Sequence, residues 1–189
     1  MLDIPEFKFC LEDNIQTLCE EQNEKYGFDY KPNDFVPKKA EELSTGWDVR
    51  CAAPDGIVLM PDRYIMIPLG FRMFAPDGWW LKLVPRSSTL IKKHIHALYG
   101  TIDESYENQL FFCGQFRPDA YEIISANRLK RIEFGTRIAQ VIPERRQEMV
   151  CSVISKDEFN ILCVGRNASR GEGGFGSTDE NDNRGTSNG

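Results

Sequence analysis

The chain has 189 residues, a formal net charge of −6 and 41% hydrophobic residues. This length suits one domain with appendages, and it is large enough to build a core without disulfide staples. The acidic balance argues against a dedicated nucleic-acid-binding surface, because such surfaces are normally basic.

The first residues, MLDIPEFKFCLEDN, carry early acids and no apolar run, so we expect no signal peptide. No stretch approaches the ~18 apolar residues of a membrane span, so we expect no membrane partner. The six cysteines show no C-x-x-C spacing, which favours reduced, structural thiols. We therefore expect a protein that is not secreted and that works in the cytoplasm, or in the host cytoplasm if it is viral.

Residues 1–41 are expected to form an N-terminal extension. Leu11, Ile15 and Leu18 recur at helical spacing among many acids, which predicts a short helix. The segment KPNDFVPKK, residues 31–39, contains two prolines and is typical of a linker or extended arm.

Residues 42–165 are expected to form the main domain. Short β-type runs are broken there by Pro, Gly and Asp, namely GIVLMP, RYIMIPLGFRMF, WWLKLVP, QLFFCGQF, YEIISA, RIAQVIP and MVCSVI. Many short strands at regular spacing predict an all-β barrel or sandwich. Residues 166–189 are nearly devoid of large apolar side chains, so we expect a flexible, Gly-rich C-terminal arm.

The arm contains a segment suited to a nucleotide, RGEGGFGST, residues 170–178. Its glycines let the backbone bend closely around a ligand and present N–H groups. Arg170 can grip a phosphate through paired hydrogen bonds, and Phe175 can stack on a base. We expect ligand to order residues 170–178, whereas 179–189 stay solvated.

A second segment, YGTIDESYENQL, offers a candidate base at residues 99–110. Asp103 follows an apolar residue and a glycine turn, so it can project from a strand end and take a proton from an attacking water. Tyr106 is three residues further on and can lie flat against a sugar ring. Taken alone, such a segment is also typical of a surface turn.

Three further segments add polar groups between apolar neighbours. PRSS places Arg86 beside Ser87 and Ser88, a compact set of donors for phosphate oxygens. GTRIAQV alternates Arg137 and Gln140 with apolar residues, and STGWDV places Asp48 after a glycine and Trp47. PRSS alone also resembles a turn or a phosphorylation site, and each of the other two segments alone fits an ordinary strand end.

Together and in this order, STGWD, PRSS, GTIDxxY, GTRIAQ and RGEGGFGST resemble the motifs of the trimeric dUTPase family, over roughly residues 44–178. The resemblance implies a jelly-roll barrel and a homotrimer with shared active sites, each closed by a C-terminal arm. It implies hydrolysis of dUTP to dUMP and pyrophosphate, with Mg²⁺ held chiefly by the triphosphate.

The resemblance also implies individual roles. Asp103 is similar to the base that activates water for attack on the α-phosphate. Asp48 is similar to the acid near the water shell of the metal and the Arg137 side chain. The implied substrate contacts are Arg86, Ser87, Ser88, Gly100, Tyr106, Gln140, Arg170, Phe175, Gly176, Ser177 and Thr178.

Departures from the family pattern leave other functions open. Ala97 and Asn108 stand where an asparagine and a glycine are common, and residues 115–134 are longer than usual. One alternative is a triphosphatase of the same fold for another or a modified pyrimidine deoxynucleotide. A dCTP deaminase-like enzyme is a second, although the glutamate it needs is not found where Gln109 and Leu110 stand. A non-catalytic protein that binds a regulator is a third.

Overall fold

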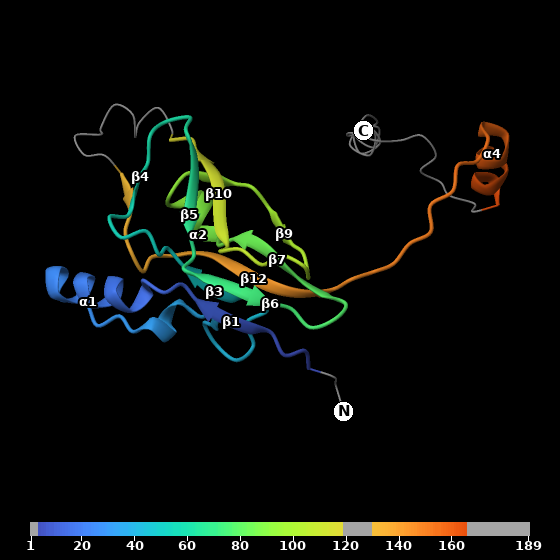
Figure 1. The fold of residues 1–189 in the computed structure, drawn as a ribbon. Helices are drawn as coiled ribbons and strands as arrows, with labels where there is room; N and C mark the ends of the chain where they lie inside the picture. The colour runs from blue at the N-terminus through green and yellow to red at the C-terminus, as the bar shows by residue number, and fades with distance from the viewer. Residues whose placement is uncertain (1–3, 119–129, 166–189) are drawn as a thin grey trace, which may run out of the picture. The chain divides into compact units, whose positions relative to one another are not determined.

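The computed structural model describes residues 4–118 and 130–165. The chain divides into two compact units, Met1–Gln147 and Glu148–Gly189. Figure 1 shows the first unit as a strand-rich body with a single longer helix, α1 (Ile15–Tyr26). The described elements include no helix long and apolar enough to cross a membrane.

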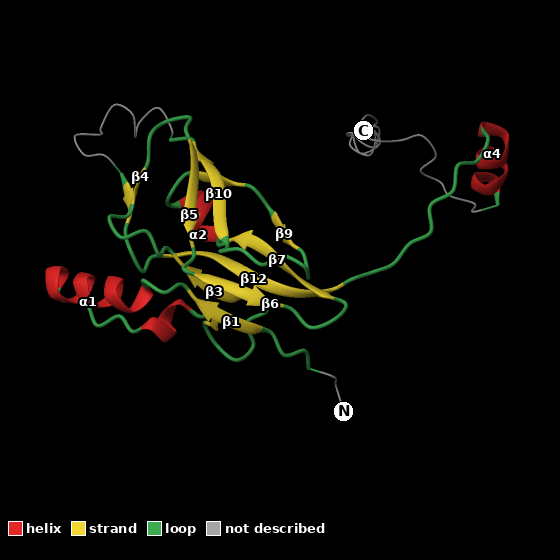
Figure 2. Ribbon diagram, viewed as in Figure 1, coloured by secondary structure: helices red, strands yellow, loops and turns green. Residues whose placement is uncertain are grey.

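Strands dominate the first unit (Figure 2), which confirms the all-β prediction. In chain order they are β1 (Lys8–Leu11), β2 (Lys38–Lys39), β3 (Trp47–Arg50), β4 (Ile57–Val58), β5 (Tyr64–Pro68), β6 (Phe71–Phe74), β7 (Trp79–Pro85), β8 (Ile95–Ala97), β9 (Gly100–Ile102), β10 (Phe111–Phe116), β11 (Arg131–Ile132) and β12 (Arg137–Arg145). A 3-10 turn, η1 (Pro32–Phe35), and a short helix, α2 (Ser87–Ile91), complete the unit.

The largest sheet has the order β2-β3-β12-β7-β9, and a second sheet has the order β5-β10-β8. Two strand pairs, β1 with β6 and β11 with β4, complete the pairing, and every pair is antiparallel. Some neighbouring strands, such as β7 and β12 or β3 and β12, are far apart in the chain. The sheets therefore bring distant motifs together.

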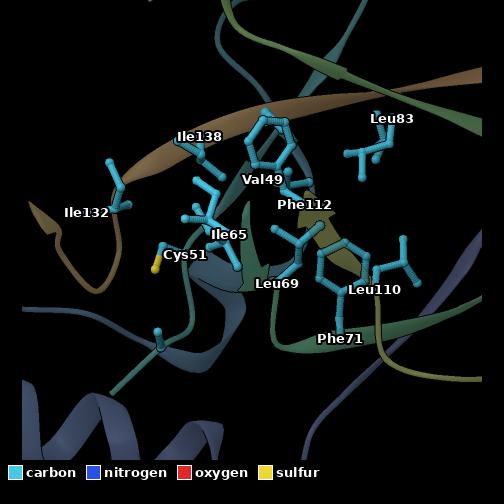
Figure 3. Close-up of a cluster of buried hydrophobic side chains, with 14 of the residues drawn as sticks. Val49, Cys51, Ile65, Leu69, Phe71, Leu83, Leu110, Phe112, Ile132 and Ile138 are labelled. Carbon is cyan, nitrogen blue, oxygen red and sulfur yellow. The ribbon is translucent and has the colours of Figure 1, made fainter. Parts of the chain in front are cut away.

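Alternation along the strands sends apolar side chains into a common core (Figure 3). In β5, Ile65 and Ile67 are buried whereas Tyr64 and Met66 are exposed, as the two-residue period of a strand requires. The largest fully buried side chains of this core include Ile67, Leu69, Phe71, Leu83, Leu110, Phe112 and Ile138.

The N-terminal extension builds a second, smaller core with the barrel. Ile15, Leu18, Cys19 and Phe35 pack with Ala52 and Phe134 in this cluster. Desolvation inside it is the main reason that the pKa of Cys19 rises to about 11. The predicted helix is confirmed as α1, but Leu11 lies in β1 and outside the helix.

The segment after β12 differs from expectation. The run MVCSVI, residues 149–154, forms no strand, and most of its side chains are exposed. A strand is stable only when its backbone N–H and C=O groups pair with another strand. No described strand pairs with residues 149–154. The expected strand YEIISA lies outside the described residues.

A helix that we did not predict, α4 (Lys156–Val164), follows this run. It begins after Ser155, whose hydroxyl accepts a hydrogen bond from the Glu158 N–H. The S-x-x-E pattern at residues 155–158 is a known signal for a helix start, so the sequence did contain the information needed to predict α4.

Candidate active site

Asp48 on β3 is the centre of a cluster of polar side chains. Its Oδ1 atom lies 3.2 Å from Nε of Arg86 and accepts a hydrogen bond of 3.1 Å from the Gln140 side-chain amide. Its Oδ2 atom lies 3.7 Å from Nε of Arg137. The Asp48 side chain is only 4% exposed, whereas those of Arg86 and Arg137 are 30% and 47% exposed. A buried carboxylate therefore holds two accessible guanidinium groups.

The register of the large sheet explains how these residues meet. Gln140 on β12 pairs with Asp48 on β3 and with Val84 on β7, and Arg86 follows the end of β7. Gly46 contributes by having no side chain, because a Cβ there would lie 3.0 Å from Cβ of Gln140. The predicted residues Asp48, Arg86, Arg137 and Gln140 are thus brought together.

The serines of PRSS lie in the first turn of α2, directly after Arg86. The next residue, Thr89, is fully buried, and its hydroxyl donates a hydrogen bond of 2.6 Å to the Ile138 carbonyl. This bond fixes α2 against β12. Sequence reasoning missed Thr89, because its partner is 49 residues away in the chain and no local pattern indicates the bond.

The surroundings of Arg86 are positively charged. Burial is the main cause that lowers the pKa of Lys93, and the charges of Lys130, Arg86 and Lys92 lower it further. Such a group of cations favours an anionic ligand near the start of α2. Several clustered cations can therefore attract phosphates even though the chain is acidic as a whole.

Asp103 lies elsewhere, directly after β9, and its side chain is exposed. The Tyr106 N–H donates to the Asp103 carbonyl at 3.0 Å, which closes a tight turn, and the Tyr106 hydroxyl donates to the Gln109 carbonyl at 3.0 Å. Asp103 and Tyr106 line one cavity of about 780 Å³ together with Trp80. The exposed carboxylate of Asp103 therefore shares a cavity with the ring of Tyr106.

Two charged neighbours of this cavity were not predicted. Glu104 accepts a hydrogen bond of 2.9 Å from the Gly78 N–H and one of 2.7 Å from the Arg146 guanidinium. These bonds attach the Asp103 turn to the β6–β7 loop and to the end of β12. The sequence does not indicate that Glu104 binds Gly78 and Arg146, because both partners are distant from Glu104 in the chain.

The two clusters lie at opposite ends of β7. Leu81 pairs with Ile102, and Leu83 pairs with Gly100, so Asp103 lies beside the start of β7. Trp80 lies at the start of β7 near Asp103, and Arg86 directly follows the end of β7. These two residues are about six positions apart, which is roughly 20 Å along a strand. Within one chain, Asp103 and Arg86 do not form one compact site.

Gly100, the remaining predicted residue of this region, lies on β9 next to β7. A Cβ at this position would lie 3.2 Å from the Leu83 Cβ, which is tighter than ordinary contact. The glycine therefore lets β9 approach β7 closely, and this pairing places the turn that carries Asp103.

The sequence matches the family model described as dUTPase over residues 33–179. The chain belongs to the dUTPase family. Deoxyuridine 5'-triphosphate nucleotidohydrolase of Roseobacter denitrificans is 32% identical over 148 residues, which are 76% of this chain and 87% of that protein. The protein of the same name from Wolbachia pipientis is 31% identical over 145 residues, with 76% and 86% covered.

Solved dUTPase structures share the fold. A mutant dUTPase of phage 80alpha has a TM-score of 0.63 at 20% identity and covers 94% of this chain and 99% of its own. The Streptococcus mutans dUTPase has a TM-score of 0.55 at 18% identity, with 76% and 98% covered. These structures and the strand-rich first unit confirm the expected dUTPase-like jelly roll.

The dUTPase arm motif, residues 170–178, lies outside the described residues, so the structure places none of Arg170, Phe175, Gly176, Ser177 and Thr178. Within residues 4–118 and 130–165, no three His, Cys, Asp or Glu side chains group as a metal site. Asp48 turns both oxygens toward side chains of the protein, and its Oδ2 is buried without a hydrogen bond. The described residues therefore offer no group of three protein ligands that would hold a metal by themselves.

Proposed function

We propose that this dUTPase-family chain hydrolyses the magnesium complex of dUTP to dUMP and pyrophosphate through attack of water on the α-phosphate. The observation that carries the proposal is the exposed Asp103 carboxylate beside Tyr106 at an open cavity, in a chain of this family. Curated relatives named deoxyuridine 5'-triphosphate nucleotidohydrolase support the same activity.

The chemistry needs a positioned base more than a covalent nucleophile. Asp103 takes a proton from the attacking water while the new P–O bond forms and pyrophosphate leaves. Tyr106 forms the wall beside the sugar, and its hydroxyl bond to Gln109 holds the ring in place. Because the Asp103 side chain is exposed, substrate and water can reach it without any change in the turn.

Charge on the triphosphate is neutralised by cations. Arg86 and Arg137 both form ion pairs with the buried Asp48, and their side chains remain 30% and 47% exposed. Oriented charges of this kind stabilise the transition state because they need no rearrangement during reaction. Mg²⁺ bound to the triphosphate would supply further positive charge.

We also infer a homotrimer with shared sites. A base acts within hydrogen-bond reach of the reacting group or through one water, so Arg86 of the same chain is too far from Asp103 to grip the same triphosphate. A second copy of the chain completes the site when its Arg86 and Arg137, held by Asp48, lie beside Asp103. Tyr64 and Met66, 85% and 62% exposed on the outer face of β5, offer apolar surface for such an assembly.

Mixing two inactive variants tests the shared site. Asp103→Asn and Arg86→Ala are each expected to lose turnover as pure proteins. Co-expressed or refolded together, they should regain a measurable fraction of activity, because some sites then combine an intact Asp103 with an intact Arg86. No recovery in verified mixed oligomers would show that each site belongs to one chain. Sedimentation of the unmodified protein gives the number of copies.

The substrate is tested by pyrophosphate release from dUTP, dCTP, dTTP, UTP and 5-hydroxymethyl-dUTP under one condition. We expect strong preference for dUTP, because a uracil site rejects cytosine by leaving buried polar groups unpaired, an effect of up to ~10⁴-fold. Equal or better hydrolysis of 5-hydroxymethyl-dUTP would favour the modified-pyrimidine alternative, which Ala97 and Asn108 leave open. No hydrolysis of any of these nucleotides would refute the proposed activity.

A further inference from the structure

We propose that the N-terminal extension positions Arg137 for the substrate phosphates, and that Tyr30 is the positioning residue. This inference rests on the proposed function, because it takes Arg137 to serve the nucleotide. The extension thereby gains a role in the site, although α1 acts on Arg137 only through Tyr30 and the turn at Gly135. A series of contacts runs from α1 through Tyr30 and Gly135 to Arg137.

The series begins with Asn23 on α1, which fixes the backbone of Tyr30. The Asn23 side chain donates a hydrogen bond of 2.8 Å to the Tyr30 carbonyl and accepts one of 2.8 Å from the Tyr30 N–H. Both backbone groups of Tyr30 are therefore satisfied by one side chain. The helix is itself anchored, because Ile15 and Leu18 are buried in the second core.

Tyr30 in turn packs on the turn before β12. Its ring contacts Phe134 edge-on, with centroids 5.6 Å apart, and occupies the space where a Gly135 side chain would lie. Gly135 has a φ of +75°, a conformation that non-glycine residues rarely adopt. The ring and the glycine backbone therefore fit against each other with no room for another side chain.

Arg50 ties the same turn to β3. Its Nη1 donates a hydrogen bond of 2.6 Å to the Gly135 carbonyl, and its guanidinium carbon lies 5.9 Å from the Tyr30 ring centroid. The Gly135 N–H donates to the Cys51 carbonyl at 2.8 Å, and the Cys51 N–H donates to the Thr136 carbonyl at 2.9 Å. The turn is thus held by the ring on one side and by β3 on the other.

Arg137 is the second residue after Gly135 and begins β12. Arg137 pairs with Arg50 of β3, the residue that also binds the Gly135 carbonyl, and the register of β12 against β3 shifts between Arg137 and Ala139. The Arg137 side chain is 47% exposed, and it forms an ion pair with Asp48. The position from which its guanidinium group reaches Asp48 therefore follows from the turn that Tyr30 supports, together with the pairing to Arg50.

The test compares Tyr30→Ala with Tyr30→Phe, which keeps the ring, and with Tyr26→Ala. Tyr26 is a matched aromatic control on the same extension, 53% exposed, with its ring against Phe28. Each variant is assayed at a temperature where circular dichroism shows it folded. We expect Tyr30→Ala to raise KM for dUTP roughly tenfold, since small misplacement of a substrate-holding group has effects of this order or larger. Tyr30→Phe and Tyr26→Ala should keep the KM of the unmodified protein.

A double-variant cycle with Arg137→Ala separates positioning from general destabilisation. If Tyr30 acts through Arg137, Tyr30→Ala adds little further increase in KM once Arg137 is removed. Full additivity of the two effects, or an unchanged KM in folded Tyr30→Ala, would overturn the inference. Should Tyr30→Ala fail to fold, Asn23→Ala replaces it, with the same expected direction and the same criteria. Absence of turnover in the unmodified protein would instead refute the proposed function.

Discussion

The Oδ1 atom of Asp48 lies 3.2 Å from Nε of Arg86, although Asp48 is on β3 and Arg86 follows β7, a strand that is not a neighbour of β3. Gln140, on the strand between them, donates to the same oxygen at 3.1 Å. A buried carboxylate that contacts two arginines and an amide holds the orientations of these side chains more firmly than an exposed ion pair does. We infer that Asp48 orients the phosphate-binding arginines.

Replacing Asp48 by Asn should therefore reduce kcat/KM for dUTP by roughly 10²-fold, since breaking a buried pair leaves charges uncompensated at a cost of a few kcal/mol. Asp62→Asn is the control, because Asp62 pairs with Arg117 at 3.5 Å while 73% exposed. Steady-state pyrophosphate release measures both. Equal activity of the two variants would contradict the orienting role of Asp48.

Asp103→Asn should preserve folding and nucleotide binding but lower kcat by ~10²-fold or more, the scale of a lost general base. The exposed position of Asp103 makes a large effect on stability unexpected. Pyrophosphate release gives kcat, and calorimetric titration with a non-hydrolysable dUTP analogue checks binding. Near-normal turnover in the folded variant would remove Asp103 from the mechanism.

Deletion of residues 166–189 should leave the oligomer intact and reduce kcat/KM severely. The prediction comes from the sequence RGEGGFGST, whose glycines and lack of apolar anchors suit a lid that closes on ligand and adds Arg170 to the phosphates. Sedimentation and steady-state kinetics are the measurements. A truncated protein that keeps most of its kcat/KM would refute the lid.

Asp34→Asn should lower the free energy of unfolding by roughly 1 kcal/mol near neutral pH. A hydrogen bond from the Lys31 N–H, followed by one from the Lys38 ammonium group, lowers the pKa of Asp34 below its usual 3.8. A carboxyl whose pKa is lowered by folding stabilises the protein at pH values above its unfolded pKa. This contribution is lost as the pH falls from about 4 through the folded pKa.

Urea unfolding from pH 7 down to about pH 3 checks this dependence. The difference between the unmodified protein and Asp34→Asn should be constant at neutral pH and should shrink at the acid end. Asp29→Asn is the control, because Asp29 is 89% exposed and lies 3.9 Å from Lys31. A difference that grows on acidification would have the wrong sign for this mechanism.

Local sequence patterns were sufficient for features built from near neighbours. Short β-type runs broken by Pro, Gly and Asp predicted the strands, and the spacing of Ile15 and Leu18 predicted α1. The glycine and apolar residue before Asp103 predicted that it projects from a strand end, and it directly follows β9. The order of the motifs was enough to indicate the family.

Tertiary structure decided which motifs meet. Asp48 and Gln140 are 92 residues apart, and they touch only because β3 and β12 pair in one register. A shift of one residue would turn every side chain of β12 to the opposite face, and no local pattern states which partner strand sets that register. The same reason hid Thr89 and Tyr30, whose partners are Ile138 and Gly135. Contacts between residues distant in sequence depend on strand order and on packing across the sheet, and those are properties of the folded chain as a whole.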